Sequence, residues 1–179
     1  MTPWGRAITA LRLLRLDPNG LGGVLVHARA GPVRDAFMAQ IATHVRLHPA
    51  LPQESLTGGI DVSQSLTEGT LVRQKGLLET QNETFVLAMA ERTAPLMSGL
   101  IARCLDQNHG NCLIALDEHL DDEAPPPPAI TDRLAFHIPL DGIALSEAIL
   151  PAKERKITTR YAVSATDADI EAFAALSMQ

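Results

Sequence analysis

Short apolar runs alternate with longer amphipathic stretches along most of the chain. Continuous apolar runs that predict buried strands fall at 24–27, 85–90, 112–116 and 134–140. Apolar residues recur at helical spacing at 4–16, 33–45, 94–107, 142–150 and 167–176, and we expect a helix in each of these stretches. Buried strands separated by helices are typical of a parallel sheet covered on both faces, so the pattern predicts an α/β fold.

The segment 47–80 breaks this alternation. It is rich in turn formers, namely Pro49, Pro52, Gly58, Gly59, Gly69 and Gly76. Within it, 60–66 and 70–74 flank the turn Thr67-Glu68-Gly69, and we expect these two stretches to pair as a β-hairpin.

Composition narrows the function classes. At 179 residues, with 46% hydrophobic and 20% charged residues, the chain is predicted to be a single globular domain. A net charge of −6 and only 3% aromatic residues argue against nucleic acid as a partner. The apolar runs are too short to span a bilayer. Cys104 and Cys112 lack CxxC spacing and lie in apolar stretches, as expected of reduced core thiols in a cytoplasmic protein.

The loop at 28–35 has the length and setting of a phosphate-binding loop, between a buried strand and a helix. The working pattern is G-x-x-x-x-G-K-[ST], in which glycines admit the phosphates, lysine contacts them and the hydroxyl holds Mg²⁺. Here Ala28 and Val33 replace the two glycines, Arg34 replaces the lysine, and Asp35 replaces the hydroxyl residue.

Two further residues weaken this loop as an anion site. Gly31 is the glycine that remains, but Pro32 after it lacks an N–H that an anion could use. Asp35 places a negative charge in the first helical turn, where the helix dipole would otherwise attract phosphate. The sequence therefore predicts weak ATP binding at this loop, or none.

The strand at 85–90 carries a second altered motif. In an active ATPase, such a strand ends in Asp-Glu, with the Asp near Mg²⁺ and the Glu polarising the attacking water. Ala90 stands at the Asp position, while Glu91 is kept. Glu91 is either a relic of that motif or a solvated loop residue.

Arg133 lies just before the last predicted strand. Ring-forming ATPases use an arginine at this point to stabilise charge on a neighbour's nucleotide. The alternative is a surface ion pair with Asp132 or another carboxylate.

Two groups of side chains could suggest a metal site. His44 and His48 are four residues apart, but Pro49 ends any helix there and no third ligand is fixed nearby. The acidic run 117–123 lies beside prolines, which is more typical of a solvated loop than of a Mg²⁺ or Ca²⁺ site. We therefore predict no metal site.

Several segments together resemble one known family. They are 16–25 (LDPNGLGGVL), 59–62 (GIDV), 76–78 (GLL) ahead of 85–91, and 132–134 (DRL). The chain resembles the N-terminal AAA+ domain of magnesium chelatase D subunits. The resemblance implies a P-loop NTPase-like AAA+ three-layer sandwich with a parallel central sheet and a β-hairpin insertion at about 56–76. It also implies a polar residue at the end of the third strand, which the sequence leaves open among residues 116–120.

The resemblance carries functional implications as well. The family's enzyme inserts Mg²⁺ into protoporphyrin IX with ATP hydrolysis, in the bacterial cytoplasm or the plastid stroma. Its I subunit is the AAA+ ATPase, its H subunit binds the porphyrin, and its D subunit joins the I ring as a platform. ATP and Mg²⁺ would then serve the whole complex. This chain would not hydrolyse ATP, and Arg133 would act as an arginine finger in trans.

We expect residues 1–179 to form one degenerate AAA+ domain, a fragment without the family's helical lid and C-terminal integrin-I-like domain. A rival interpretation is a divergent ATPase that uses Arg34 in place of lysine, since arginine is a good phosphate ligand. A third is an interaction domain unrelated to porphyrin, which would rest on fold analogy alone.

Overall fold

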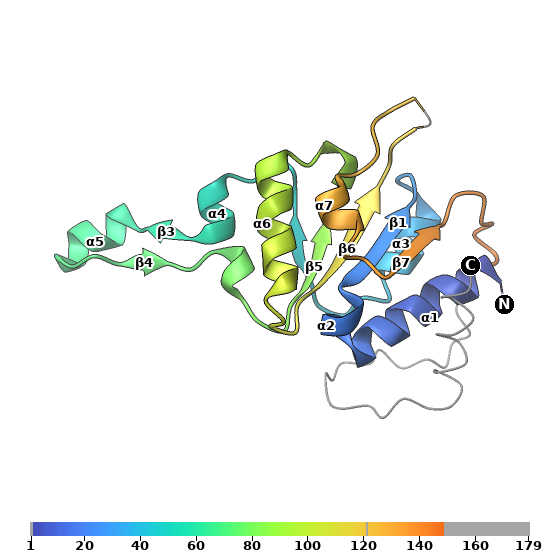
Figure 1. Cartoon of the computed structure of the whole chain (residues 1–179), viewed down its shortest axis with the longest axis horizontal. Coiled ribbons are helices and arrows are strands. Elements are labelled where there is room, and N and C mark those ends of the chain that lie inside the picture. Colours follow the sequence, from blue (N-terminus) through green and yellow to red (C-terminus); the bar gives the residue numbers. More distant parts are fainter. Residues whose placement is uncertain (1, 121, 149–179) are drawn as a thin grey trace.

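A sheet of five parallel strands forms the centre of the molecule, in the order β2-β5-β6-β1-β7 (Figure 1). The computed structural model describes residues 2–120 and 122–148. The strands are β1 (Gly23–His27), β2 (Val45–Leu47), β5 (Thr84–Leu87), β6 (Cys112–Asp117) and β7 (Phe136–Pro139). The predicted parallel sheet is confirmed.

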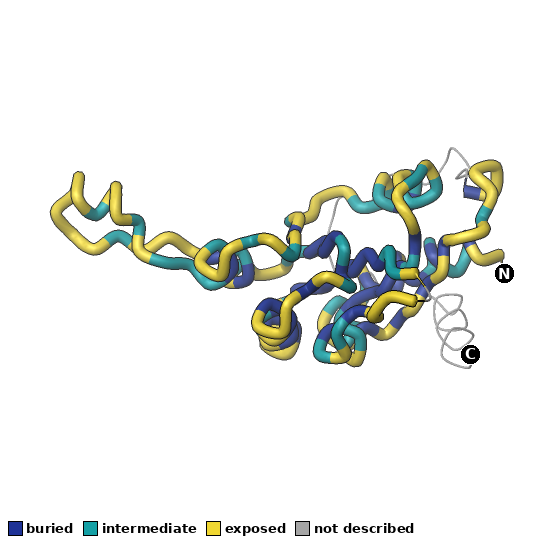
Figure 2. The backbone as a smooth tube through the Cα atoms, turned by 90° about the horizontal axis from the view of Figure 1, so that it is seen from above, coloured by how far each residue is buried: buried dark blue, intermediate teal, exposed yellow. Residues whose placement is uncertain are grey.

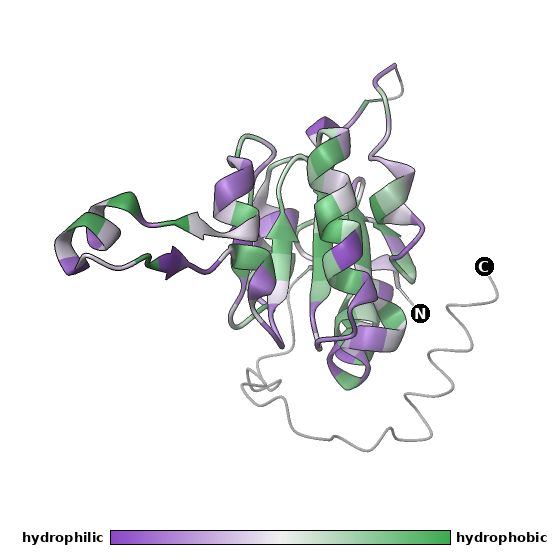
Figure 3. Ribbon diagram, turned by 60° about the vertical axis from the view of Figure 1, so that its left-hand side comes forward, coloured by the Kyte–Doolittle hydropathy of each residue, from purple (hydrophilic) through white to green (hydrophobic). Residues whose placement is uncertain are grey.

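Helices cover both faces of the sheet and make a three-layer sandwich. One face packs against α1 (Pro3–Leu16) and α3 (Pro32–Met38), and the other against α6 (Pro95–Asp106) and α7 (Pro128–Thr131). Side chains alternate along each strand. In β6, Leu113 and Ala115 therefore enter the α6 core, while Cys112, Ile114 and Leu116 enter the α1 core. Both cores are apolar (Figure 3).

The two cysteines lie in these cores, as expected. Cys104 and Cys112 are both buried and carry free thiols. Burial raises the pKa of the Cys104 thiol because a thiolate would lose its hydration there. This thiol therefore acts as a core residue and is a poor nucleophile.

Strand order determines which loops meet. Because β6 lies between β5 and β1, the carboxyl ends of β5, β6, β1 and β7 are consecutive along one edge of the sheet. In register, His27 at the end of β1 lies beside Asp117 of β6 on one side and Pro139 of β7 on the other. Ligands of open α/β sheets bind at this edge.

An arm, residues 58–76, extends away from the sheet (Figure 1). Its stem is a short antiparallel pair, β3 (Gly59–Ile60) with β4 (Arg73–Gln74), and its tip contains the helix α5 (Val62–Glu68). The chain enters the arm from α4 (Gln53–Thr57) and leaves it into the 3₁₀ helix η1 (Leu77–Glu79). The hairpin insertion is thus present, but its ladder is much shorter than predicted.

Capping explains why 60–66 is not the predicted strand. The Asp61 carboxylate accepts the Gln64 backbone N–H at 2.9 Å, which caps the first turn of α5. Gly69, with φ of 65°, ends that helix in the left-handed conformation. These local signals outweigh the alternating pattern because the arm has no sheet face to cover (Figure 2).

Backbone contact at the base of the arm requires glycine. A Cβ on Gly76 would lie 2.3 Å from the Gly58 nitrogen, and Gly58 itself has φ of +77°. A side chain at either position would force apart the two segments of the chain at the base of the stem.

Other element boundaries also differ from the prediction. The helix expected at 33–45 ends at Met38, and Val45–Leu47 forms the edge strand β2. A strand of three residues is too short for its periodicity to be read from sequence. Three other short helices were not predicted, namely α2 (Pro18–Leu21), α4 and α7. The strand predicted at 85–90 ends at Leu87, and its last predicted residue begins the 3₁₀ turn η2 (Ala90–Arg92). Residues 142–148 form turns instead of the predicted helix, and the helix expected at 167–176 lies outside the described residues.

Candidate functional site at the carboxyl edge of the sheet

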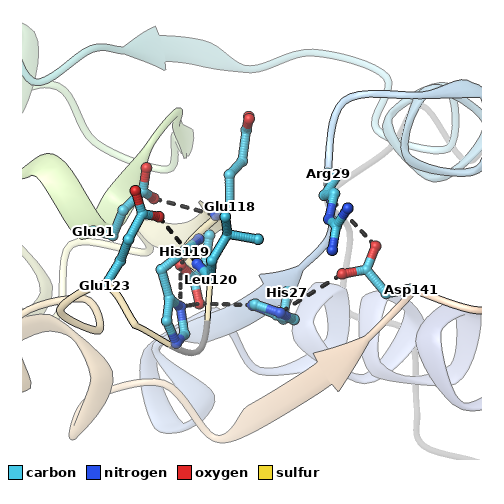
Figure 4. Close-up of polar contacts among 9 residues, drawn as sticks. His27, Arg29, Glu91, Glu118, His119, Leu120, Glu123 and Asp141 are labelled. Atoms are coloured by element: carbon cyan, nitrogen blue, oxygen red, sulfur yellow. Dashed lines mark hydrogen bonds and ion pairs between the residues drawn. The ribbon is translucent and has the colours of Figure 1, made fainter.

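Three segments singled out from the sequence meet at this edge. The loop after β1, Glu91 after β5, and residues 117–120 at the end of β6 follow adjacent strands. Figure 4 shows their polar side chains in contact.

The loop after β1 leaves little room for a ligand. Residues 28–34 and 140–143 line a hollow of about 170 Å³. Small-molecule and cofactor pockets are usually about 300–1,000 Å³. The Ala28 backbone N–H donates to the Asp117 carbonyl at 2.9 Å, so the start of the loop is bound to β6. The helix α3 then begins at Pro32, with Gly31 as an N-cap that offers no side-chain hydrogen bond.

Arg34, at the position of the phosphate-loop lysine, is paired within the chain. Its guanidinium forms an ion pair with the Glu118 carboxylate, and only 17% of the Arg34 side chain is exposed. Asp35 follows on the exposed side of the first turn of α3. The cation that a phosphate would need is therefore already bound to an acidic group.

A second carboxylate occupies a backbone donor of the loop. The Arg29 N–H donates to the Asp141 carboxylate at 3.3 Å (Figure 4). In a working phosphate loop, such backbone N–H groups face the phosphates. Asp141 therefore stands where an incoming anion would have to compete with it.

Glu91 bridges two strand ends. It lies in the turn η2, preceded by Met89 with φ of 49°, and only 6% of its side chain is exposed. One carboxylate oxygen accepts the Glu118 backbone N–H at 3.2 Å, and the other lies 3.4 Å from the Arg92 guanidinium. Glu91 is thus a partly enclosed residue with a structural contact to the end of β6, unlike a solvated loop residue.

The polar residue at the end of the third strand is Asp117, within the range left open by the sequence. Asp117 belongs to β6 and its side chain is 2% exposed, so it is not part of a solvated acidic loop. Its carboxylate lies 3.0 Å from His27 Nδ1, and its two oxygens lie 2.8 and 2.7 Å from His119 Nδ1. It also accepts the His119 backbone N–H at 3.1 Å.

Arg133 lies at the opposite edge of the sheet. It precedes β7, so it is at the amino edge, away from the loop after β1. Its guanidinium contacts both oxygens of Asp106 at 2.8 and 2.7 Å and donates to the Ala129 carbonyl at 2.8 Å. This pairing holds the pKa of Asp106 below its usual value and raises the pKa of Arg133. The ion pair considered from sequence exists, with Asp106 in place of Asp132.

His44 and His48 do not lie on one helix. They flank the edge strand β2 and both are exposed. His48 Nδ1 instead accepts the Ala50 backbone N–H at 3.1 Å. His44 precedes β2 and His48 follows it, so the two histidines lie at opposite edges of the sheet, at the ends of its outermost strand.

Sequence reasoning missed His27 and His119. Each ends or follows an apolar run, which is a weak signal by itself. Their proximity depends on β6 lying beside β1, although β1 and β6 are far apart along the chain. A sequence search for ligands at the ends of all buried strands would have found His27 and Asp117 as candidates, but not their contact.

Comparisons with known proteins point to one family. No family model matches the chain. It is 38% identical over 181 residues to the magnesium-chelatase 60 kDa subunit of Cereibacter sphaeroides, which covers 98% of this chain and 32% of that protein. It is 35% identical over 144 residues to the subunit of the same name from Rhodobacter capsulatus, covering 77% of this chain and 25% of that protein. The chain thus spans about a third or less of the relatives' length.

A solved structure supports the fold. The chain is similar to a "putative ATPase" from Cytophaga hutchinsonii, with a TM-score of 0.55, 14% identity, and coverage of 80% of this chain and 51% of that one. Together with the parallel sheet, this supports the predicted α/β fold with a parallel central sheet. In the part of the chain that the structure describes, no helix has both the length and the apolar character needed to cross a membrane.

Proposed function

We propose that the chain is an AAA+ platform of magnesium chelatase that does not hydrolyse ATP. The starting point is that the chain belongs to the family of magnesium-chelatase 60 kDa subunits. The enzyme would insert Mg²⁺ into protoporphyrin IX with ATP hydrolysis, on the way to (bacterio)chlorophyll. The chain would assemble with the ATPase I subunit, and the H subunit would bring the porphyrin. The observation that carries the proposal is that the loop's own cation and backbone donor are bound by carboxylates of the same chain.

The residues of the loop do not fit the phosphates of ATP. A triphosphate placed there would meet Asp141, Glu118 and Asp35, and would have to displace Glu118 from Arg34. Two like unit charges 4 Å apart repel by about 4 kcal/mol at an effective dielectric constant near 20. Without the lysine, both glycines and the hydroxyl, little remains to offset that repulsion.

Features away from the loop support a partner role. The arm exposes four large apolar side chains, those of Ile60, Val62, Leu66 and Leu71. Apolar side chains gathered on an exposed projection are typical of protein–protein contacts. The Arg133 side chain is 35% exposed at the other edge of the sheet, where its guanidinium would stabilise charge on a nucleotide of the I subunit.

Reconstitution tests the platform role. The full chain is mixed with the I subunit, and the complex is measured by size-exclusion chromatography with light scattering, with and without ATP. We expect a complex, and no ATP hydrolysis by the chain alone. Absence of a complex under both conditions would remove the platform role.

A trio of variants tests Arg133. Arg133→Ala removes the guanidinium and the ion pair, Asp106→Ala removes only the ion pair, and Arg103→Ala removes another exposed arginine of the neighbouring helix α6. If Arg133 acts in trans, ATP hydrolysis by the assembled I subunit falls only with Arg133→Ala, by roughly 10³-fold or more for a full arginine finger. Equal activity in all three variants would show that Arg133 is structural.

The rival function is a divergent ATPase, and the specific observation that favours it is a cation at the lysine position. Nucleotide is titrated into the wild-type chain and into two single variants, Arg34→Ala and Glu118→Gln. This titration distinguishes the rival function from the platform role. Micromolar ATP binding that Arg34→Ala removes would favour the rival. Our proposal expects no saturable binding by the wild type, and at most weak binding once Glu118→Gln frees Arg34.

A further inference from the structure

We infer that His27, Asp117 and His119 form a binding site for a divalent transition-metal ion of the Zn²⁺ class. One ligand atom from each residue can be chosen so that all of them lie within 4.8 Å of one another. Two imidazoles and one carboxylate are a recurring protein ligand set for Zn²⁺ and Fe²⁺, with further positions left for water.

The three side chains are gathered closely enough to share an ion after a small movement. A tetrahedral Zn²⁺ with ligands at about 2.1 Å places neighbouring ligand atoms about 3.4 Å apart, slightly farther than the present hydrogen-bond distances. His27 Nδ1 lies 3.0 Å from Asp117 Oδ2, and His119 Nδ1 lies 2.7 Å from the same oxygen. The two imidazole rings have centroids 4.9 Å apart and an angle of 64° between their planes, so they are not stacked face to face.

The surroundings favour a cation. The Asp117 carboxylate is 2% exposed, whereas the side chains of His119 and His27 are 25% and 37% exposed. The carboxylate is thus enclosed, while the two imidazoles are partly open to solvent. A buried carboxylate is stabilised by a bound cation, and the open side leaves a path for the ion.

An outer carboxylate lies where metal-bound histidines usually have one. Asp141 Oδ2 is 3.6 Å from His27 Nε2, on the opposite side of the ring from Asp117. Such a carboxylate fixes the ring orientation and makes the imidazole a better ligand. Asp141 therefore serves both the loop and the proposed site.

The ligand set also selects the metal. Mg²⁺ prefers oxygen ligands in octahedral geometry, whereas imidazole nitrogen suits Zn²⁺, Fe²⁺, Co²⁺ and Ni²⁺. The site is therefore separate in chemistry from any Mg²⁺ that accompanies ATP or enters a porphyrin. It does not depend on whether the chain hydrolyses ATP. The competing explanation is a hydrogen-bonded His–Asp–His group that holds β1 to β6 without metal.

Metal titration of the full, tag-free chain distinguishes the metal site from the metal-free hydrogen-bonded group. After chelator treatment, Zn²⁺ and Mg²⁺ are titrated separately by calorimetry. We expect one Zn²⁺ per chain with micromolar or tighter affinity, and at least about 100-fold weaker Mg²⁺ binding. Co²⁺ in place of Zn²⁺ should give visible absorption bands with nitrogen ligation. No saturable Zn²⁺ binding, or equal binding of Mg²⁺, would overturn the site.

Matched histidine variants locate the ion. His119→Ala and His27→Gln should each weaken Zn²⁺ binding by about 100-fold, and Asp141→Asn by about tenfold, the lower end of effects of outer carboxylates. The controls are His109→Ala and the double change His44→Ala with His48→Ala, all at exposed positions. Circular dichroism checks that each variant is folded. Binding that survives both His119→Ala and His27→Gln, or that is lost with a control, would contradict the assignment.

Discussion

The carboxyl edge of the sheet and the arm differ in where their interactions are satisfied. At the edge, Arg34 pairs with Glu118, Asp117 pairs with two histidines, and Glu91 accepts the backbone N–H of Glu118, just after β6. On the arm, Leu66 and Leu71 are 80% and 75% exposed. The polar groups at the edge pair with one another within the chain, whereas the apolar side chains of the arm are exposed and could be covered by another protein. We therefore expect changes at the edge to alter stability and changes on the arm to alter assembly.

The largest effect is expected from Asp117→Ala. The change removes a nearly buried acceptor from two imidazoles and one backbone N–H, and hydrogen bonds to charged groups contribute about 1.5–3 kcal/mol each. We expect the free energy of unfolding in urea to fall by about 3–5 kcal/mol. Asp122→Ala, at an exposed position nearby, is the control and should change it by less than about 0.5 kcal/mol. Equal stability of both variants would mean that the edge is not held by Asp117.

Glu91→Ala should give a smaller loss. Removing the carboxylate leaves the Glu118 N–H without this acceptor, and an unsatisfied buried group costs about 1–3 kcal/mol. Glu91→Gln keeps an acceptor oxygen and should recover most of the loss, again measured by urea unfolding. If the two variants are equally destabilised, the charge of Glu91 matters more than its hydrogen bond.

Charges on the arm should leave stability unchanged. We expect Leu66→Glu with Leu71→Glu to alter the free energy of unfolding by less than about 0.5 kcal/mol, because both side chains are already in water. The same double change should weaken the complex with the I subunit by about tenfold or more, which is about 1.4 kcal/mol. Thr67→Glu with Thr70→Glu adds the same charge at exposed polar positions of the arm and is the control. An unaffected complex would move the interface away from the arm.

The smallest effect concerns Asp106 and Arg133. The pKa of Asp106 is lowered in the folded chain, so the pair adds stability above the carboxyl's ordinary pKa and loses it as the pH falls through the lowered value. Following the Asp106 carboxyl by NMR, we expect Arg133→Gln to return its pKa toward the ordinary value. High salt should do the same in part. A pKa that does not move in Arg133→Gln would show that Arg133 is not the cause.

Much of the fold could be predicted from sequence, because strong local patterns coincide with tertiary burial. The apolar run 112–116 becomes β6 with one added residue, and 94–107 becomes α6 within one residue at either end. Prediction failed where the pattern was short or conflicting. Val45–Leu47 is too brief to show a period, and the capping residues Asp61 and Gly69 turned an expected strand into α5.

The candidate site, too, could be predicted from sequence only in part. The losses at Ala28, Val33, Arg34, Asp35 and Ala90 are readable from sequence because each motif position has a fixed chemical task. The groups that Arg34 and Glu91 contact could not be predicted from sequence. Both belong to Glu118, which follows β6 and is distant along the chain.

The sequence by itself predicted the α/β class and showed the departures from the phosphate-loop pattern, because these depend on residue types at fixed spacing. Its resemblance to magnesium chelatase D subunits agrees with the relatives found. Only the tertiary structure decided that His27, Asp117 and His119 meet, and that Arg133 lies at the edge opposite the loop. The first follows from the strand order β2-β5-β6-β1-β7, which places β6 beside β1, and the second from the parallel pairing of β7 with β1. Strand order arises from long-range packing of the two cores, and no local pattern of residues encodes it.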